Sequence, residues 1–207
     1  MTPTDITKRL LTYRLSLLHF KEMGLNEVYS HSLSMDTGYS ATLIRKDFSH
    51  LKIRGKRRSG YEIDTILESI GRYFGEKEIH QVILVGLGNI GKAMIQYKDF
   101  EKQKIKIIAV FDVDPAKQRK KMNVPVLPVE DCPKFIADHD IVAAVIAVPA
   151  LSAQNICDRL VYAGIKGILN FAPVNLKVPD NVYVANVSLS DELEQVIYHA
   201  SQRKQTV

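Results

Sequence analysis

One short stretch, a glycine-rich turn between a buried-strand pattern and a helical pattern, constrains the fold of this sequence more than any other feature. The apolar run 82–85 leads directly into Gly86-Leu87-Gly88-Asn89-Ile90-Gly91, and a helical pattern continues to residue 98. In such a turn the first glycine permits the tight bend, the second lets the backbone approach a pyrophosphate, and the third lets the helix pack on the strand. The helix N-terminus supplies amide N–H groups to the phosphates. The motif therefore predicts a dinucleotide-binding Rossmann fold.

An acidic residue at the end of the next expected strand indicates which dinucleotide binds. The apolar run 105–111 is followed by Asp112, 21 residues beyond Gly91. A carboxylate at this place accepts hydrogen bonds from the adenosine ribose and repels a 2′-phosphate, so NAD is expected rather than NADP. The basic run Lys117–Lys121 could favour NADP, but it lies several residues further on, and we interpret it as a solvent-exposed face. The alternative for the whole motif is a glycine-rich turn that binds nothing.

Further apolar runs extend the expected sheet. Runs 141–148 and 167–171 alternate with helical patterns at 89–98 and 152–163. Continuous Val/Ile-rich runs separated by helices are typical of a parallel sheet covered on both faces. The second half of the chain is therefore predicted to be an α/β, doubly wound parallel sheet.

The C-terminal segment is predicted to be a helix with an apolar stripe. Ser188 and Asp191 form a plausible capping box at its start. The stripe consists of Leu189, Leu193, Val196, Ile197 and Ala200. Since no strand follows for the helix to cover, we expect the stripe to need another surface, such as that of a second subunit.

The first half of the chain has the pattern of a helix-turn-helix. Helices are expected at 7–23, closed by Gly24, at 32–37, capped by Ser32, and at 41–51, capped by Ser40. A glycine-containing turn before the third helix fits this motif. The residues expected to be buried are Leu11, Leu15 and Leu18, widened by Leu10, Leu17 and Phe20, in the first helix, and Leu43, Ile44, Phe48 and Leu51 in the third.

A basic segment follows the third helix. Gly55 and Gly60 punctuate it, which suggests a small hairpin or wing, and a helix over 62–74 comes next with Ile63, Ile66, Leu67 and Ile70 at helical spacing. Between Arg45 and Arg58 there are seven basic residues and one acid, Asp47, although the net charge of the whole chain is only +5. A solvent-exposed charged face is the alternative, but we expect double-stranded DNA to bind here, with phosphates supplying most of the affinity. The expected DNA contacts are Ser40, Thr42, Arg45, Lys46, Lys56, Arg57 and Arg58.

Composition adds three bounds. The hydrophobic content of 46% is ordinary for a globular protein. The N-terminus lacks the apolar core of a signal peptide, and no apolar run is long enough to span a membrane, so a cytoplasmic protein is expected. Cys132 and Cys157 have a spacing that fits no metal site, and we interpret them as inert thiols in a reducing compartment.

These features together resemble the Rex family of redox-sensing transcriptional repressors over nearly the whole chain. The order and spacing of the motifs carry the resemblance. They are Tyr13-Arg14, residues 44–49, residues 55–57 with Gly60-Tyr61, residues 86–91, Tyr97 with Phe100, residues 111–114, residues 147–150, residues 167–173 and Asn186-Val187.

The resemblance implies a homodimer with swapped C-terminal helices, which binds a palindromic operator with NAD+ and leaves it with NADH. The implied domains are a winged helix-turn-helix at 1–78, a Rossmann domain at 79–187 and a dimerisation helix at 188–207. The nicotinamide ring would lie near Tyr97 and the turn 170–173. The expected cofactor contacts are Gly86, Leu87, Gly88, Asn89, Ile90, Gly91, Tyr97, Asp112, Val148, Pro149, Phe171, Ala172 and Pro173.

The sequence departs from the family pattern in three places. A Phe-Gly-x-Phe-Gly stretch is usual where this chain has residues 51–55, and a small residue is usual at Arg58. At Ser188 the family often has an aspartate, which links to the tyrosine matching Tyr97 and the arginine matching Arg14. Arg58 makes the wing more basic than is usual in the family, and the departure at Ser188 puts the redox relay in question.

Two other functions fit parts of the sequence. A small NAD-dependent dehydrogenase would need a substrate domain, for which the chain has no room, and Tyr97 and His139 are only isolated acid–base candidates. A module that binds CoA or an adenine nucleotide is the second alternative, because the Rex sensor domain resembles the CoA-binding domain of succinyl-CoA synthetase. Asp112 argues mildly against it. No catalytic residue is expected.

Overall fold

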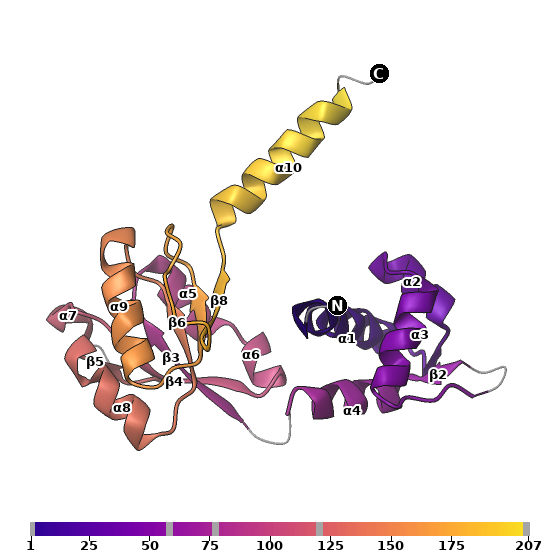
Figure 1. The fold of residues 1–207 in the computed structure, drawn as a ribbon, viewed down its shortest axis with the longest axis horizontal. Coiled ribbons are helices and arrows are strands. Elements are labelled where there is room, and N and C mark those ends of the chain that lie inside the picture. Colours follow the sequence, from indigo (N-terminus) through magenta and orange to yellow (C-terminus); the bar gives the residue numbers. More distant parts are fainter. Residues whose placement is uncertain (1–2, 57–59, 76–78, 119–121, 205–207) are drawn as a thin grey trace. The chain divides into compact units, whose positions relative to one another are not determined.

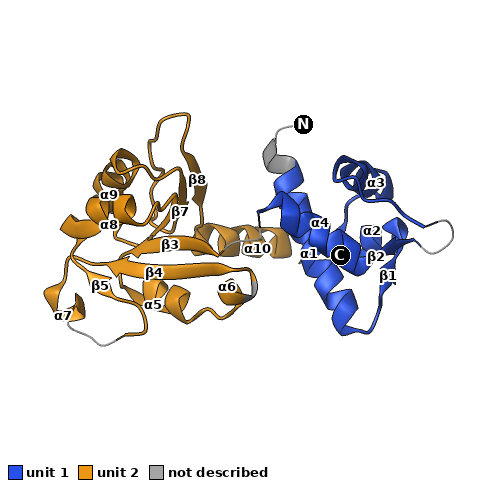
Figure 2. Ribbon diagram, turned by 90° about the horizontal axis from the view of Figure 1, so that it is seen from below, with its two compact units in different colours: residues 1–78 blue, residues 79–207 orange. Residues whose placement is uncertain are grey.

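The computed structural model describes residues 3–56, 60–75, 79–118 and 122–204. The chain divides into two compact units, residues 1–78 and 79–207, which are drawn in different colours in Figure 2. None of the described helices is long and apolar enough to cross a membrane.

The described residues of unit 1 form four helices and a two-stranded antiparallel sheet (Figure 1). Its elements are α1 (Pro3–Glu22), β1 (Glu27–Val28), α2 (Ser30–Thr37), α3 (Ala41–His50), β2 (Tyr61–Glu62) and α4 (Ile63–Tyr73). Gly38, in the left-handed region at φ 74°, ends α2, and Ser40 caps α3 by accepting a hydrogen bond from the Leu43 N–H. The turn and cap that the sequence predicted before α3 are therefore present.

The buried face of α1 differs from the predicted one. The side chains of Leu10, Tyr13 and Leu17 are fully buried, whereas Leu15 is 72% exposed and its neighbours on the predicted stripe, Leu11 and Leu18, are 41% and 45% exposed. The predicted burial of Leu10 and Leu17 is confirmed, but the predicted centre of the stripe, Leu11, Leu15 and Leu18, was wrong. The reason is that α1 carries leucines on two adjacent faces, and helical spacing alone does not say which face meets the core.

Two further predictions in unit 1 need adjustment. The second helix begins at Ser30 after Tyr29, so Ser32 lies inside it and does not cap it. In α3, Ile44 and Phe48 are buried as expected, but Leu43 and Leu51 are only half-buried. Sequence patterning also did not place the charged residues Arg9 and Asp47 in this core, where they are 4% and 2% exposed.

Unit 2 contains a six-stranded parallel sheet with the strand order β5-β4-β3-β6-β7-β8. Its strands are β3 (His80–Val85), β4 (Ile105–Phe111), β5 (Val126–Leu127), β6 (Ala143–Ile146), β7 (Gly167–Asn170) and β8 (Tyr183–Asn186). The chain leaves β3 toward one edge and then returns to β6 on the other side of β3, which is the doubly wound topology that the sequence predicted.

The described helices of unit 2 are α5 (Asn89–Gln96), α6 (Asp99–Lys102), α7 (Pro115–Gln118), α8 (Cys132–Asp138), α9 (Ala150–Tyr162) and α10 (Leu189–Lys204), with a short 3₁₀ helix at Val129–Asp131. Of these, α5 and α6 pack on one face of the sheet, and α8 and α9 pack on the other. Alternate residues of β3 enter different cores: Ile83 packs with residues of α8 and α9, and Leu84 packs with residues of α5 and α6. This alternation is what a sheet buried on both faces requires.

The last helix, α10, extends away from the sheet after β8 (Figure 1). The Asp191 N–H donates to Ser188 Oγ at 3.3 Å, so the predicted serine cap is present. The apolar stripe remains uncovered among the described residues, because Leu189, Leu193, Val196 and Ile197 are each 59–67% exposed.

Candidate dinucleotide site and nucleic-acid interface

The three glycines of the turn after β3 differ in whether the surrounding structure leaves room for a side chain. Gly86 has φ +101°, and a Cβ there would lie 2.4 Å from the Ala147 carbonyl oxygen. A Cβ on Gly91 would lie 2.1 Å from the Gly86 carbonyl oxygen, so close packing of α5 on the turn excludes a side chain. A Cβ on Gly88 would meet nothing within 4 Å. Gly86 and Gly91 are thus required by the fold itself, whereas Gly88 opens onto free space where a ligand could approach.

A cavity of about 310 Å³ lies beside this turn. It is formed at the carboxyl ends of β3, β4 and β6, which is the place where doubly wound sheets bind ligands. Of the predicted cofactor contacts, the cavity brings together Gly86, Gly88, Asp112, Val148 and Pro149.

The cavity also includes residues that sequence reasoning missed, namely Val113, Asp114, Lys117, Val129, Ser152 and Ile156. Residues 113 and 114 directly follow the strand end at Asp112, so their position was a usable signal. Residues 152 and 156 lie in the first turns of α9, which begins at the same edge of the sheet after β6. A helix that starts beside a ligand-binding edge could have been expected to contribute them.

Asp112 is 5% exposed and accepts three hydrogen bonds. Its Oδ2 accepts from the Leu87 N–H at 2.7 Å and from Lys117 Nζ at 2.9 Å, and its Oδ1 accepts from the Asp114 N–H at 2.9 Å. Burial raises the pKa of this carboxyl, but the hydrogen bonds from Asp114, Leu87 and Lys117 outweigh burial, so the pKa lies below its ordinary value. A carboxylate has about four acceptor positions, so three accepted hydrogen bonds leave one position of Oδ1 unused among the described residues.

The contact with Lys117 corrects one sequence interpretation. The basic run that begins at Lys117 was expected to be solvent-exposed, but the Lys117 side chain is only 32% exposed and its ammonium is bonded to Asp112. The run starts in a short helix, α7, which folds back on the strand end. Residues 119–121 lie outside the described residues.

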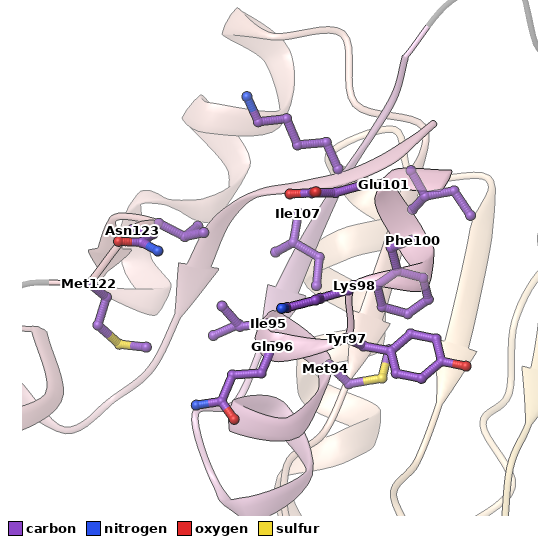
Figure 3. Close-up of a pocket in the computed structure, with 13 residues that line it drawn as sticks. Met94, Ile95, Gln96, Tyr97, Lys98, Phe100, Glu101, Ile107, Met122 and Asn123 are labelled. Atoms are coloured by element: carbon purple, nitrogen blue, oxygen red, sulfur yellow. The ribbon is translucent and has the colours of Figure 1, made fainter. Parts of the chain in front are cut away.

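Tyr97 lies in a different hollow from the glycine turn. This hollow, of about 630 Å³, is drawn in Figure 3 and is lined by residues of α5, α6, β4 and 122–124. Tyr97 is 54% exposed, and its ring packs edge-on against Phe100 with centroids 5.0 Å apart. The expectation that Tyr97 shares a nicotinamide site with the turn 170–173 stays a prediction.

The turn 170–173 is held by Asn170, whose side chain is fully buried. Its Nδ2 donates to the Val174 carbonyl at 2.8 Å and to Asn186 Oδ1 at 2.9 Å, and its Oδ1 accepts from the Ala172 N–H at 3.0 Å. Phe171, Ala172 and Pro173 do not line the cavity beside Gly86.

Other predicted cofactor contacts lie at the start of α5. Leu87, two residues before the helix, is buried, whereas Asn89 and Ile90 in its first turn are exposed.

In unit 1 the predicted DNA contacts on α3 face outward. All four are exposed, namely Ser40, Thr42, Arg45 and Lys46. The Arg45 guanidinium donates to Ser30 Oγ at 3.1 Å and to Thr42 Oγ1 at 3.2 Å. These weak, exposed hydrogen bonds hold the arginine along the helix and can be exchanged for bonds to a ligand.

The wing is described only in part. Lys56 is exposed, its Nζ lies 3.6 Å from Glu62 Oε2, and its backbone forms an antiparallel bridge with Gly60. Arg57 and Arg58 lie outside the described residues.

A buried ion pair joins α3 to α1. Arg9 Nε and Nη2 each donate to the Asp47 carboxylate at 2.7 Å, and the Tyr13 hydroxyl donates to Asp47 Oδ2 at 2.9 Å. Burial and the neighbouring Asp47 raise the pKa of Tyr13, so its hydroxyl keeps its proton. The acid within the basic cluster therefore points into the core, and the outer surface of α3 keeps its positive charge.

Both cysteines are free and buried. Burial raises the pKa of Cys132 to about 12 and also raises the pKa of Cys157. Burial of both thiols agrees with their interpretation as structural cysteines, and the raised pKa values disfavour the thiolate form.

Comparisons with known proteins cover both units. The family model of the CoA binding domain matches residues 77–174. The chain is 37% identical to Redox-sensing transcriptional repressor Rex 1 of Thermotoga maritima, over 97% of each protein. It is 38% identical to Redox-sensing transcriptional repressor Rex of Streptomyces avermitilis, over 98% of this chain and 80% of that one.

A solved structure of the Rex-family repressor RSP in complex with β-NAD+ and operator DNA matches all of this chain and 95% of that one. The identity is 32% and the TM-score is 0.90. The structure of RSP in complex with β-NADH matches with a TM-score of 0.88 and the same identity, over 100% of this chain and 97% of that one.

Proposed function

This chain belongs to the Rex family of redox-sensing transcriptional repressors, and we propose that it binds operator DNA through unit 1 and is released when NADH occupies unit 2. It is a regulator that senses NAD(H) and not an enzyme. The observation that carries the proposal is that one chain joins an open dinucleotide cavity to an α3 surface that keeps its positive charge. We place its action in the cytoplasm.

The proposed cofactor site follows from the geometry of the cavity. The open face of Gly88 and the amide groups at the start of α5 would bind the pyrophosphate, and the remaining acceptor position of Asp112 would bind the adenosine ribose. Val148 and Pro149 would flank the cofactor, and the nicotinamide would extend toward Tyr97 and residues 171–173. Bound NAD(H) supplies a ring whose charge and planarity differ between its two redox states. We expect NADH to bind more tightly than NADPH, and calorimetry measures both affinities.

The proposed DNA surface has two parts. Ser40, Thr42, Arg45 and Lys46 would contact DNA from the first turns of α3, where a recognition helix reaches base edges in the major groove. Lys56, Arg57 and Arg58 would contact phosphates from the wing.

We propose that the active form is a homodimer with exchanged α10 helices. Two aligned apolar stripes are largely exposed among the described residues. One lies on α10, and the other is formed by Leu11, Leu15 and Leu18 of α1. An aligned apolar stripe indicates an interaction site more strongly than scattered exposed residues do. A two-fold dimer would present two copies of α3 to a palindromic operator. Deletion of residues 188–207 is expected to give monomers in sedimentation, and a dimeric truncated protein that still binds operator would contradict the exchange.

Gel-shift binding to a palindromic duplex tests the function directly. We expect the duplex to be retained with NAD+ and released with NADH at the same concentration. The matched duplex with one half-site scrambled is the control, since a dimer that needs both half-sites loses most of its affinity for it. Equal binding in the two redox states would contradict a redox sensor.

A further inference from the structure

Lys117 holds its ammonium group against the carboxylate that we assign to the adenosine ribose. Its Nζ lies 2.9 Å from Asp112 Oδ2, and the lysine and aspartate side chains are 32% and 6% exposed. Both residues line the cavity beside Gly86 and Gly88. The aspartate therefore faces the cavity as one half of an ion pair and not as an isolated negative charge.

The backbone around Lys117 directs this contact. Asp114 accepts the Ala116 N–H on its side chain at 2.9 Å and the Lys117 N–H on its carbonyl oxygen at 3.0 Å. On the other side, Gln118 Nε2 donates to the Asp112 carbonyl oxygen at 2.8 Å. Asp114 thus caps the start of α7, and Gln118 at its end is bonded to Asp112, the residue that follows β4, so the helix holds the ammonium at the carboxylate.

We propose that Lys117 sets how strongly this chain discriminates between NADH and NADPH, by neutralising the charge that Asp112 presents to a 2′-phosphate. The proposal rests on the proposed cofactor site. A carboxylate alone would exclude NADPH by like-charge repulsion. The bonded ammonium opposes that repulsion, and its two other N–H donors can face an added phosphate. NADH, which has hydroxyls at that place, is affected much less.

Neutral substitutions of Lys117 separate this role from a purely structural one. Lys117→Met removes the charge at similar length, and Lys117→Gln removes the charge but can still donate a hydrogen bond to Asp112. Lys117→Arg keeps the charge. A lysine that only anchors α7 would leave the ratio of the two nucleotide affinities unchanged in all three variants, even where both affinities fall.

The experiment is calorimetric titration of NADH and NADPH into the full chain and its variants. We expect both neutral variants to raise the NADH preference by roughly tenfold, because charges near a protein surface are only partly screened. Lys117→Arg should keep the starting ratio. The matched control is Lys166→Met, which removes an exposed lysine just before β7, at the amino end of that strand and thus away from the carboxyl ends that form the cavity. This variant should leave both affinities unchanged.

Each outcome bears on the proposal. An unchanged or lower NADH preference in both neutral variants overturns it, and thermal unfolding run alongside identifies any variant that is not folded. If only Lys117→Met fails to fold, Lys117→Gln supplies the ratio. If the starting chain binds neither nucleotide, the proposed cofactor site is wrong and this inference falls with it, whereas NADH binding with an unchanged ratio overturns the inference alone.

Discussion

Asp47 in unit 1 and Asp112 in unit 2 are both buried carboxylates paired with a cation, but the first pair is sealed and the second is open. The side chains of Arg9 and Asp47 are 5% and 3% exposed, and the arginine approaches with two nitrogen atoms. Lys117 is 32% exposed, and the other partners of Asp112 are backbone N–H groups next to a cavity.

This difference distinguishes an acid that supports the fold from an acid that can meet a ligand. Asp47 receives its hydrogen bonds from side chains of α1, so its effect is to fix α3 against α1. Asp112 organises the glycine turn through Leu87 and still faces the cavity. Burial alone therefore does not identify a functional acid. A functional acid is identified instead by the exposure of its cationic partner and by an adjacent cavity.

The largest expected effect comes from breaking the sealed pair. Arg9→Met should lower the free energy of unfolding of unit 1 by about 3–5 kcal/mol, because it leaves the Asp47 charge buried without its partner. Operator binding should fall with it, while NADH binding by unit 2 persists. Urea unfolding and NADH titration measure the two quantities.

Lys21→Met is the matched control for Arg9→Met. Lys21 also pairs α1 with another helix, since it bonds to Asp64 of α4, but the two side chains are 51% and 58% exposed. Such a pair contributes about 0–1 kcal/mol. Equal losses in the free energy of unfolding for Arg9→Met and Lys21→Met would mean that the buried Arg9–Asp47 pair contributes no more to stability than an exposed pair does.

Removing the charge of the open acid should act on the ligand rather than on the fold of unit 1. Asp112→Asn is expected to weaken NADH binding by about 1.5–3 kcal/mol, the range of hydrogen bonds to charged groups. It should weaken NADPH binding less, because the repulsion of a 2′-phosphate is also removed. Calorimetry with both nucleotides decides this, and unaltered NADH affinity would place the ribose elsewhere.

The pH dependence of stability should also report on Asp112. Its pKa in the folded protein lies below the ordinary value, so its contribution to stability is present above the ordinary aspartate pKa of about 3.9 and is lost as the pH falls through the lower folded value. Asp112→Asn should therefore lose less stability than the starting chain in that acidic range. Asp180→Asn, at an exposed position before β8, is the control. Identical acid profiles for all three proteins would show that Asp112 makes no such contribution.

A smaller effect is expected at the cations beside Asp47. Lys46→Ala should weaken operator binding and lower the salt slope by about one counterion, since a phosphate contact releases about one cation. Lys134→Ala, in α8 of unit 2, is the control and should leave the slope unchanged. If both variants keep the full slope, the outward face of α3 does not contact phosphate.

The elements with strong local patterns could be predicted from the sequence. The strand 105–111 and the helices α5 and α9 follow from apolar runs and spacing, and the glycine turn follows from its motif. The two-residue β5 has too little sequence for a pattern, and the four residues of β8 have half-buried or exposed side chains. Their strand character comes from pairing with β4 and β7, which is a property of the folded sheet.

The site could be predicted where it depends on chain position and not where it depends on side-chain direction. Gly86, Gly88 and Asp112 follow from motif spacing. The contact of Lys117 with Asp112 requires α7 to turn back on β4, and the ion pair of Arg9 with Asp47 joins residues 38 positions apart. Neither contact has a sequence pattern, so the lysine in the basic run was expected to be exposed, and no pattern in the sequence placed the acid of the basic cluster in the core.

The smallest effect is expected at Ser188. This position extends the comparison of Asp47 and Asp112, because here the chain has a neutral serine and no carboxylate. Its hydroxyl accepts from the Asp191 N–H and lies 3.0 Å from Ser190 Oγ, so it is a neutral cap of α10. A ligand shifts a conformational equilibrium only by its differential affinity for the two states, and a shift from 99:1 to 1:99 requires about 5.5 kcal/mol. A neutral hydroxyl forms weaker hydrogen bonds than a carboxylate does, so it can contribute less to that difference.

We therefore expect that operator release by Ser188→Asp responds more steeply to a rising NADH/NAD+ ratio. Ser188→Asn, which keeps a cap without a charge, should leave the steepness of release unchanged. Since aspartate is also a good N-cap, a steeper response in the aspartate variant alone would assign the effect to charge. Identical release curves for all three proteins would mean that residue 188 only caps α10.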